Sequence, residues 1–338
     1  MQFFSREFYA NFMQKLDIPF SSCYISFIMK KNGIKEIAAE AGVSAATVSR
    51  VLNNSPRISR DVTQRVLDVA RRLEYLPHTQ LTRVIALIVS SFNSYESLLI
   101  SAIQHCAAER KLRLELILPS APDYWSNRLY IGGISTTSME IPPSAFPFVV
   151  INKAPAQPNG IYSVASDDVA AIAEAVQKFH KAGHSKIGLL LAQYGTNYNN
   201  LQRVEGYLSA CRANFLNPYK EIISVSEPLV ENALKRLLKH GITALIYMVP
   251  IEINPQKLFA KLNIRIPKDL SLILWESLGM PSNYRPDYTK VFQNFRELAR
   301  TSIEMLERLA QKKTLPPQIL VPYIWEERNS IRKLAKPR

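Results

Sequence analysis

The sequence predicts an N-terminal all-α helix-turn-helix domain followed by a larger α/β domain of two lobes. Two helical patterns separated by a tight turn occupy the stretch before residue 58. From residue 84 onward, short apolar runs typical of strands alternate with amphipathic helical patterns. The chain has 338 residues, which exceeds one ordinary domain and leaves room for a small domain and a body of about 250 residues.

The small domain begins with a helix predicted over Ile34–Ala41, whose apolar residues recur at helical spacing. Gly42 follows and allows the left-handed conformation that ends a helix sharply. Ser44 is a suitable N-cap for a second helix over Ala45–Leu52. A third helix, from about Ser59 to Tyr75, is needed to complete a miniature core. The expected core residues are Ile34, Ile37, Ala38, Ala41, Val48, Val51, Leu52, Val62, Val66, Leu67, Val69, Ala70 and Leu73.

The outer face of the second helix is slim enough to enter the major groove of duplex DNA. Its small side chains leave room for approach, and Arg50 can donate two hydrogen bonds to a guanine edge. Asn53 and Arg57 are candidates for contacts to the DNA backbone. The predicted DNA-binding residues are Ser44, Ala45, Ala46, Thr47, Ser49, Arg50, Asn53 and Arg57.

This segment resembles the LacI/GalR family of bacterial transcriptional regulators. The resemblance rests on Gly42-Val43-Ser44 followed by Ala46-Thr47-Val48-Ser49-Arg50-Val51-Leu52-Asn53, with Glu74-Tyr75-Leu76-Pro77 further on. It implies a homodimeric, sequence-specific regulator of transcription, a repressor in our leading interpretation. The alternative is a three-helix domain that binds no nucleic acid.

The net charge of +14 and the isoelectric point near 9.6 suit a polyanionic partner such as DNA. The three cysteines, Cys23, Cys106 and Cys211, are too few and too scattered for a disulfide framework or a zinc site. We therefore expect a cytoplasmic protein without cofactor or metal. No apolar run approaches the roughly 18 residues that a membrane span requires.

Residues 1–28 are rich in aromatic side chains but lack helix or strand periodicity and do not form a convincing signal peptide. Met29-Lys30-Lys31 stands at the position where chains of the LacI/GalR family usually begin. We therefore favour a mis-assigned start codon and place the DNA-binding domain at residues 29–77. The alternative is an extension that packs on this domain or mediates self-association.

The body, residues 84–338, restarts its strand–helix alternation after Val164, which predicts two lobes of parallel βαβ units. Two such lobes resemble a periplasmic-binding-protein-like sensor, which implies a small ligand between the lobes and a dimerisation role. Strands are expected at 84–89, 112–118, 130–134, 148–151, 186–191, 222–225, 244–248 and 271–275. Helices are expected at 98–110, 169–182, 202–214, 230–240, 255–262 and 295–311.

The resemblance also suggests effector-binding residues, namely Asn93, Tyr95, Arg203, Trp275, Glu276 and Phe295. Arg203 lies in an Arg-x-x-Gly pattern whose arginine would grip a sugar hydroxyl or carboxylate; the alternative is an arginine in a salt bridge. Glu276 stands where the family has an effector-binding Asp, and it would then accept hydrogen bonds from the effector. The alternative is a carboxylate that faces solvent. Trp275 and Phe295 fit a core position better than a ligand platform. Gly183-His184 resembles the family's structural entry to a strand of the second lobe.

Two departures from the family's pattern weaken the prediction of a sensor. Val249 and Pro250 replace a polar pair, so one rim of the site would be apolar. Residues 78–83 form a hinge several residues shorter than usual, in which Leu81 could serve as a minor-groove wedge and Arg83 as a phosphate contact. The leading hypothesis is a repressor controlled by a sugar-like effector, such as a deoxy, acylated or aryl-substituted derivative. The alternatives are a constitutive regulator with a degenerate sensor and, least supported, an enzyme or transport receptor.

Overall fold

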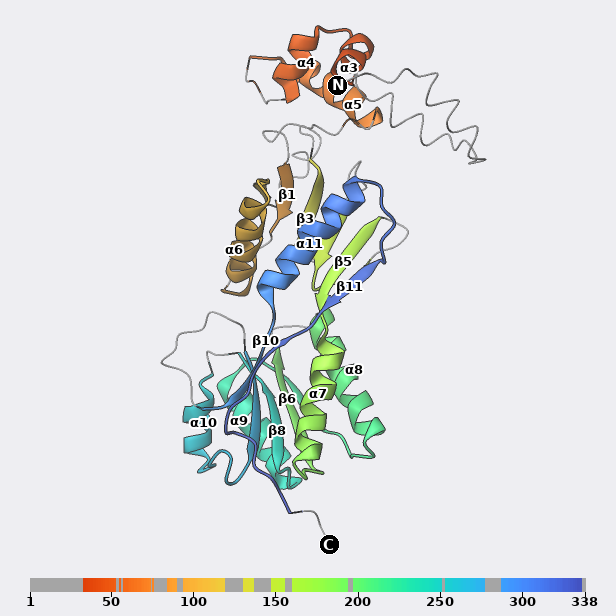
Figure 1. The fold of residues 1–338 in the computed structure, drawn as a ribbon. Helices are drawn as coiled ribbons and strands as arrows, with labels where there is room; N and C mark the ends of the chain where they lie inside the picture. Colours follow the sequence, from red (N-terminus) through yellow and green to blue (C-terminus); the bar gives the residue numbers. More distant parts are fainter. Residues whose placement is uncertain are drawn as a thin grey trace, which may run out of the picture. The chain divides into compact units, whose positions relative to one another are not determined.

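A computed structural model describes residues 33–52, 55, 57–73, 75, 84–89, 94–118, 130–136, 147–155, 160–193, 197–250, 253–276 and 287–335 (Figure 1). These residues belong to two compact units, a small N-terminal one and a large one that contains the rest of the chain. The predicted extension at residues 1–28 and the predicted hinge at residues 78–83 lie outside the described residues.

The small unit contains α3 (Gly33–Ala41), α4 (Ala45–Leu52) and α5 (Arg60–Arg72). Every residue that the sequence predicted for its core lies in, or packs against, a single apolar cluster. The third helix begins one residue later and ends three residues earlier than predicted. The all-α helix-turn-helix prediction is therefore confirmed.

The turn between α3 and α4 has the predicted chemistry. Gly42 adopts a φ of +65°, and the N–H of Val43 donates to the carbonyl of Ala38 at 2.9 Å, which closes the end of α3. The hydroxyl of Ser44 accepts from the N–H of Thr47 at 3.1 Å and thereby caps α4. These two contacts fix the angle at which α4 leaves α3.

The large unit contains two six-stranded sheets, one in each predicted lobe, within the described residues. The first has the order β11-β5-β4-β3-β1-β2, and all its neighbouring strands run parallel. Its elements are β1 (Val84–Ile88), α6 (Ser94–Glu109), β2 (Arg113–Ile117), β3 (Gly132–Ser135), β4 (Phe148–Ile151), β5 (Ile161–Ser166), α11 (Phe295–Ala310) and β11 (Gln318–Val321).

The second sheet has the order β12-β10-β9-β8-β6-β7, in which only β12 pairs antiparallel to its neighbour. Its elements are α7 (Asp168–Lys181), β6 (Ile187–Gln193), α8 (Tyr198–Ala213), β7 (Tyr219–Ser224), α9 (Glu227–Lys239), β8 (Ala244–Met248), α10 (Pro255–Lys261), β9 (Ser271–Glu276), β10 (Thr289–Phe292) and β12 (Ile324–Glu326). The prediction of two α/β lobes is confirmed.

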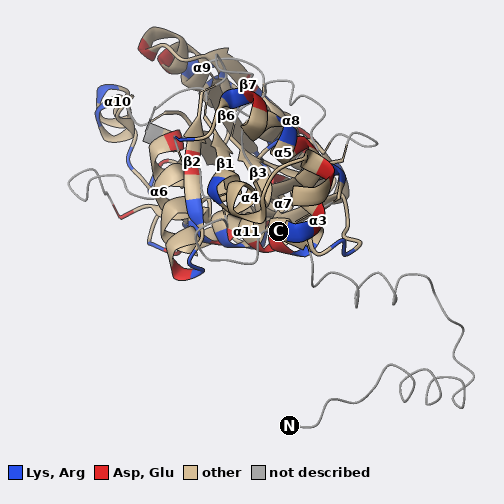
Figure 2. Cartoon of the chain, turned by 90° about the horizontal axis from the view of Figure 1, so that it is seen from above, with Lys and Arg blue, Asp and Glu red and all other residues tan. Residues whose placement is uncertain are grey.

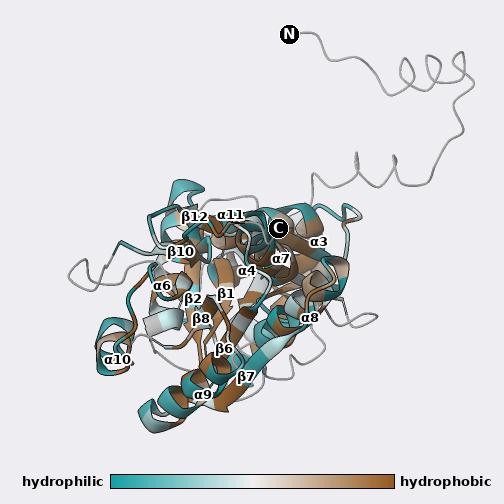
Figure 3. Cartoon of the chain, turned by 90° about the horizontal axis from the view of Figure 1, so that it is seen from below, coloured by the Kyte–Doolittle hydropathy of each residue, from teal (hydrophilic) through white to brown (hydrophobic). Residues whose placement is uncertain are grey.

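Helices cover both faces of the second sheet. Helices α7 and α8 pack on one face through one apolar cluster, and α9 and α10 pack on the other face through another. In the first sheet, α6 and α11 share a cluster with β1, β3, β4 and β5. Figure 3 shows hydrophobic central strands and hydrophilic outer helix surfaces. Strands buried on both faces explain why their sequences are almost uniformly apolar.

The observed elements differ from the predicted ones in the number of strands and in several helix starts. Strands β5, β10, β11 and β12 were not predicted; β12 spans only three residues, and β11 and β12 lie at sheet edges. Helix α6 begins at Ser94, four residues earlier than predicted, so Tyr95 belongs to a helix and not to a loop. Glu96 in its first turn favours this earlier start because a carboxylate stabilises a helix N-terminus.

The chain crosses between the two sheets three times within the described residues: from β5 to α7, from β10 to α11 and from β11 to β12. These connections bring residues that are far apart in the sequence to the junction of the lobes. The polar side chains described below lie on or beside these crossings.

Candidate functional site

The predicted DNA-binding face lies on the side of α4 that is turned away from the core of the small unit. Val48 and Val51 are buried, whereas Ala45, Ala46 and Arg50 are exposed. Within the part of the chain that is described, no hydrogen bond or ion pair holds the Arg50 side chain. A long cation beside two small side chains therefore points away from the core and can reach a partner.

The remaining predicted DNA contacts have varied surroundings. The hydroxyls of Ser44 and Thr47 lie 2.9 Å apart and engage each other, so Ser44 serves the fold through its cap as well. Ser49 is half-buried and Arg57 is exposed. Asn53 lies outside the described residues.

Positive charge is not confined to the small unit, since Lys and Arg also occur on helices of the large unit (Figure 2). Residues 79–338 contain 31 Lys and Arg against 21 Asp and Glu. Basic composition alone therefore does not single out the DNA-binding surface. The geometry of α4 carries that assignment.

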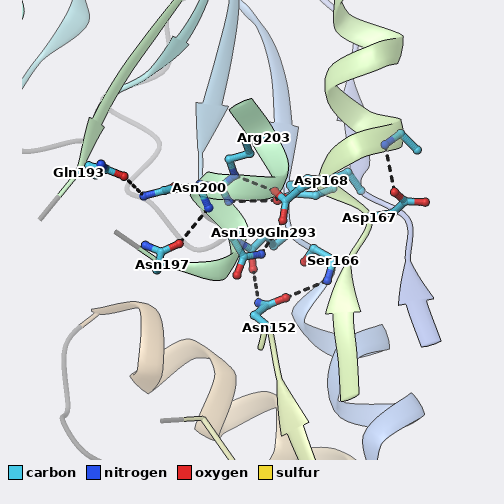
Figure 4. A network of polar contacts seen from close by, with 12 residues as sticks. Asn152, Ser166, Asp167, Asp168, Gln193, Asn197, Asn199, Asn200, Arg203 and Gln293 are labelled. Atoms are coloured by element: carbon cyan, nitrogen blue, oxygen red, sulfur yellow. Dashed lines mark hydrogen bonds and ion pairs between the residues drawn. The ribbon is translucent and has the colours of Figure 1, made fainter. Parts of the chain in front are cut away.

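The large unit contains a buried ion pair between Arg203 of α8 and Asp168, the first residue of α7 (Figure 4). The Nε of Arg203 donates to Oδ1 of Asp168 at 2.7 Å, and their side chains are 13% and 0% exposed. The hydroxyl of Tyr323 donates to the same oxygen at 2.6 Å, and the amide of Asn199 donates to Oδ2, also at 2.6 Å. The carboxylate thus has partners on both oxygens.

The guanidinium of Arg203 has further partners. Nη1 donates to Oδ1 of Asn200 and Nη2 donates to the hydroxyl of Tyr323, each at 3.1 Å. Burial disfavours the charged form, yet Tyr323 and Asp168 together raise the pKa of Arg203. Burial also raises the pKa of Tyr323, which keeps its hydroxyl protonated and able to donate. Arg203 is a permanent cation in this cluster.

Trp275 and Tyr323 complete the surroundings of Arg203. Their ring centroids lie 4.9 Å apart, and the guanidinium carbon of Arg203 lies 5.8 Å from the Trp275 ring. Trp275 is 8% exposed and packs in the apolar cluster under α7 and α8, as a core residue would. Its indole Nε1 is nevertheless buried without a hydrogen-bond partner among the described residues.

A second polar cluster surrounds Asn152, which follows β4 with a φ of +55°, a conformation that Asn tolerates better than most residues. Its amide donates to Oε1 of Gln293 at 2.9 Å and to the hydroxyl of Tyr95, while its Oδ1 accepts from the N–H of Ser166 at 2.8 Å. Burial raises the pKa of Tyr95 to about 12. This cluster joins the β5–α7 and β10–α11 crossings.

The structure thus brings together part of the predicted effector site. Tyr95 and Phe295 form an edge-to-face pair with centroids 5.4 Å apart, and Phe295 is 4% exposed in the core of the first lobe. The charges of Arg203 and Asp168 both act on the pKa of Tyr95, so the two clusters influence each other. Asn93 and the side chain of Glu276 lie outside the described residues.

Sequence reasoning missed Asp168, Tyr323, Asn152 and Gln293. The signal for Asp168 was the pair Asp167-Asp168, in which Asp167 caps α7 by accepting from the N–H of Ala170 at 3.0 Å. A helix needs only one such cap, so the second carboxylate was available for another role. The predicted structural role of Gly183-His184 agrees with the structure, since both ring nitrogens of His184 have partners, the hydroxyl of Thr243 and the carbonyl of Arg332.

The described helices include none with the length and apolarity that a membrane span requires. Among the same residues, no group of three or more potential metal-ligating side chains comes together.

Comparison with known proteins gives two family matches. Residues 33–78 match the lacI family of bacterial regulatory proteins, and residues 176–331 match the periplasmic binding protein-like domain. The probable HTH-type transcriptional repressor ExuR of Bacillus subtilis (strain 168) is 27% identical over 335 residues, which cover 89% of this chain and 99% of that protein. Catabolite control protein A of Priestia megaterium is 23% identical over 339 residues, covering 88% and 99%.

Solved structures show the same fold. The lac repressor dimer bound to operator and the anti-inducer ONPF is 21% identical, with a TM-score of 0.61 over 88% of this chain and 98% of that one. The complex of the transcriptional regulator CelR with cellobiose is 19% identical, with a TM-score of 0.58 over 88% and 99%. By its two matched domains and its relatives, the chain belongs to the LacI family of DNA-binding transcriptional regulators.

Proposed function

We propose that this protein is a homodimeric repressor that reads a specific operator through α4 and whose DNA affinity is set by a small sugar-like effector. The observation that carries the proposal is the exposed face of α4, where Arg50 stands beside Ala45 and Ala46 while the opposite face is anchored in the core. A rigid, slim helix with one extended cation fits direct readout in a major groove.

The test of this proposal is the substitution Arg50→Ala, assayed by selection on randomised DNA and by titration on the selected operator. Loss of a bidentate contact to guanine should cost ~1–3 kcal/mol and relax the sequence preference at one position of each half-site. Arg65→Ala is a matched control because Arg65 is an exposed arginine of α5 outside the predicted contact set. An unchanged sequence preference in Arg50→Ala would contradict the proposed readout.

The effector would bind at the junction of the lobes, beside Arg203. Relatives support a ligand of this kind, since the CelR structure is described as a cellobiose complex and the lac repressor structure as an anti-inducer complex. An effector can change DNA affinity only if it binds two arrangements of the lobes unequally. Residues on the three crossings are well placed to sense such a difference.

The second candidate is a constitutive regulator whose sensor binds no effector. Two observations favour it: Val249 is 6% exposed within an apolar cluster, where the family's pattern has a polar residue, and Arg203 already has an internal carboxylate partner. Titration of operator binding against a panel of sugars separates the candidates. Invariant DNA affinity throughout the panel would favour the constitutive regulator.

Arg203→Ala alone is a poor test of effector binding because it leaves the carboxylate of Asp168 buried without its cation. The double variant Asp168→Asn/Arg203→Met removes both charges and keeps side chains of similar size. We expect it to bind the operator normally and to lose any response to the effector. A full response would place the effector site elsewhere.

A further inference from the structure

The Arg203–Asp168 pair fixes the charge of the proposed effector site before any ligand arrives. The two groups make contact at 2.7 Å, and Asp168 has no exposed side-chain surface. The cation of Arg203 is therefore compensated from within the protein. A ligand does not have to supply the negative charge.

The same junction contains a second pair of opposite charges in the first lobe. These are Glu96 of α6, which is 6% exposed, and Lys153. Burial lowers the pKa of Lys153, and the negative charge of Glu96 raises it. The charges of Glu96, Arg203 and Asp168 all act on the pKa of the buried Tyr95 hydroxyl, so these three groups lie around Tyr95.

Not every hydrogen-bond donor around the neutral pair has a partner within the protein. Three of the five N–H groups of Arg203 have partners among the described residues, which leaves two. The indole N–H of Trp275 and the hydroxyl of Ser166 are buried without a partner among the described residues. A buried donor without an acceptor costs free energy, so an acceptor oxygen of a ligand that reached one of these groups would be stabilised.

We infer that Asp168 makes this site selective for uncharged, hydroxyl-bearing ligands over their carboxylate and phosphate counterparts. This inference rests on the proposed function as an effector-controlled regulator. An anion beside the pair would be attracted by Arg203 and repelled by Asp168, and it would still lose its hydration on binding. A hydroxyl group can accept from the free donors and also donate, whereas an ionised carboxylate can only accept.

The first arm of the test compares matched ligands on the full-length wild-type protein by calorimetry. Suitable pairs are glucose with glucuronate, galactose with galacturonate, and ribose with ribose 5-phosphate. We expect each pair that binds to favour the uncharged member by at least ~10-fold in Kd. Tighter binding of the anionic member in any pair would overturn the inference.

The second arm uses inorganic phosphate as a probe and does not depend on knowing the effector. We expect phosphate to raise the melting temperature of Asp168→Asn more than that of the wild type, because the variant leaves Arg203 uncompensated. The double variant Asp168→Asn/Arg203→Met should lose this extra shift because it removes the uncompensated cation. Equal phosphate shifts in the wild type, the single variant and the double variant would overturn the role of Asp168.

The two proposals can fail separately. If no ligand of any pair binds either the wild type or Asp168→Asn, while operator binding is intact, the effector proposal fails and the selectivity falls with it. If ligands bind and alter DNA affinity but the anionic members are preferred, the effector proposal stands and the role assigned to Asp168 is wrong.

Discussion

The energetic role of the Arg203–Asp168 pair can be measured by a double-mutant cycle. Two unit charges about 4 Å apart interact by ~4 kcal/mol at an effective dielectric constant of ~20. Removing one partner of a buried pair costs about 3–5 kcal/mol because the other charge stays buried alone. We therefore expect Asp168→Asn and Arg203→Met each to lower the free energy of unfolding by about this amount.

The two single variants should not be equally unstable. Asp168 is fully buried, whereas Arg203 is 13% exposed and keeps its contacts to Asn200 and Tyr323. Arg203→Met should therefore be the more damaging change. The double variant should be less destabilised than the sum of the singles by ~2–4 kcal/mol, because it leaves no uncompensated charge.

The assay is chemical denaturation of the four proteins, with comparison of the slopes to confirm that the same transition is measured. An exposed pair in the same lobe serves as the control: Arg236 and Glu221 also make contact at 2.7 Å, but their side chains are 50% and 21% exposed. Their coupling should be only about 0–1 kcal/mol because water screens both charges. Additive losses at Arg203 and Asp168, within ~0.5 kcal/mol, would refute the reasoning.

Three further predictions follow from single residues. Arg57→Ala should weaken binding to all DNA sequences alike and lower the salt dependence by about one unit, whereas a loss confined to one operator would make Arg57 a base reader. Gly206→Ala should lower the free energy of unfolding, measured by chemical denaturation, by ~1–3 kcal/mol, because the added Cβ would lie 2.9 Å from the backbone Cα of Val169. Unchanged stability would show that α7 and α8 can separate freely. Burial lowers the pKa of His184, so its contribution to stability is present above its unfolded pKa of about 6.5 and is lost as the pH falls through the folded pKa. As the pH is lowered from 7 to 5, the melting temperature should therefore fall less steeply for His184→Gln than for the wild type. Equal slopes would show that His184 does not cause the loss of stability at low pH.

The small unit was predictable because its determinants are local. Gly42 and Ser44 set the turn through contacts within five residues along the chain, and helical periodicity identified the core. Most buried strands of the two sheets were also recognisable from their apolar runs, but β5 and β10 were missed although most of their residues are buried. By contrast, β11 and β12 are short, lie at sheet edges and contain half-exposed residues, so their sequences resemble loops.

The candidate effector site was only half predictable for the same reason. Arg203 could be found from its own pattern, but its partners Asp168 and Tyr323 lie 35 and 120 residues away. The crossings between the lobes bring these positions together. No helical or strand periodicity in the sequence can therefore indicate that they are in contact. The sequence therefore left open whether Arg203 faces a ligand or a salt bridge, and the structure adds the salt bridge.

A salt bridge does not exclude Arg203 from ligand binding, but it changes what a mutation there can reveal. Asp168 begins α7 and Tyr323 lies on the β11–β12 crossing, so the pair connects a helix of the second lobe to a segment that joins the lobes. Loss of Arg203 would alter that connection as well as any contact to an effector. Alanine scanning would therefore report the two effects as one. Only charge-balanced changes, in which Asp168 and Arg203 are replaced together, can separate the recognition of an effector from the coupling of the lobes.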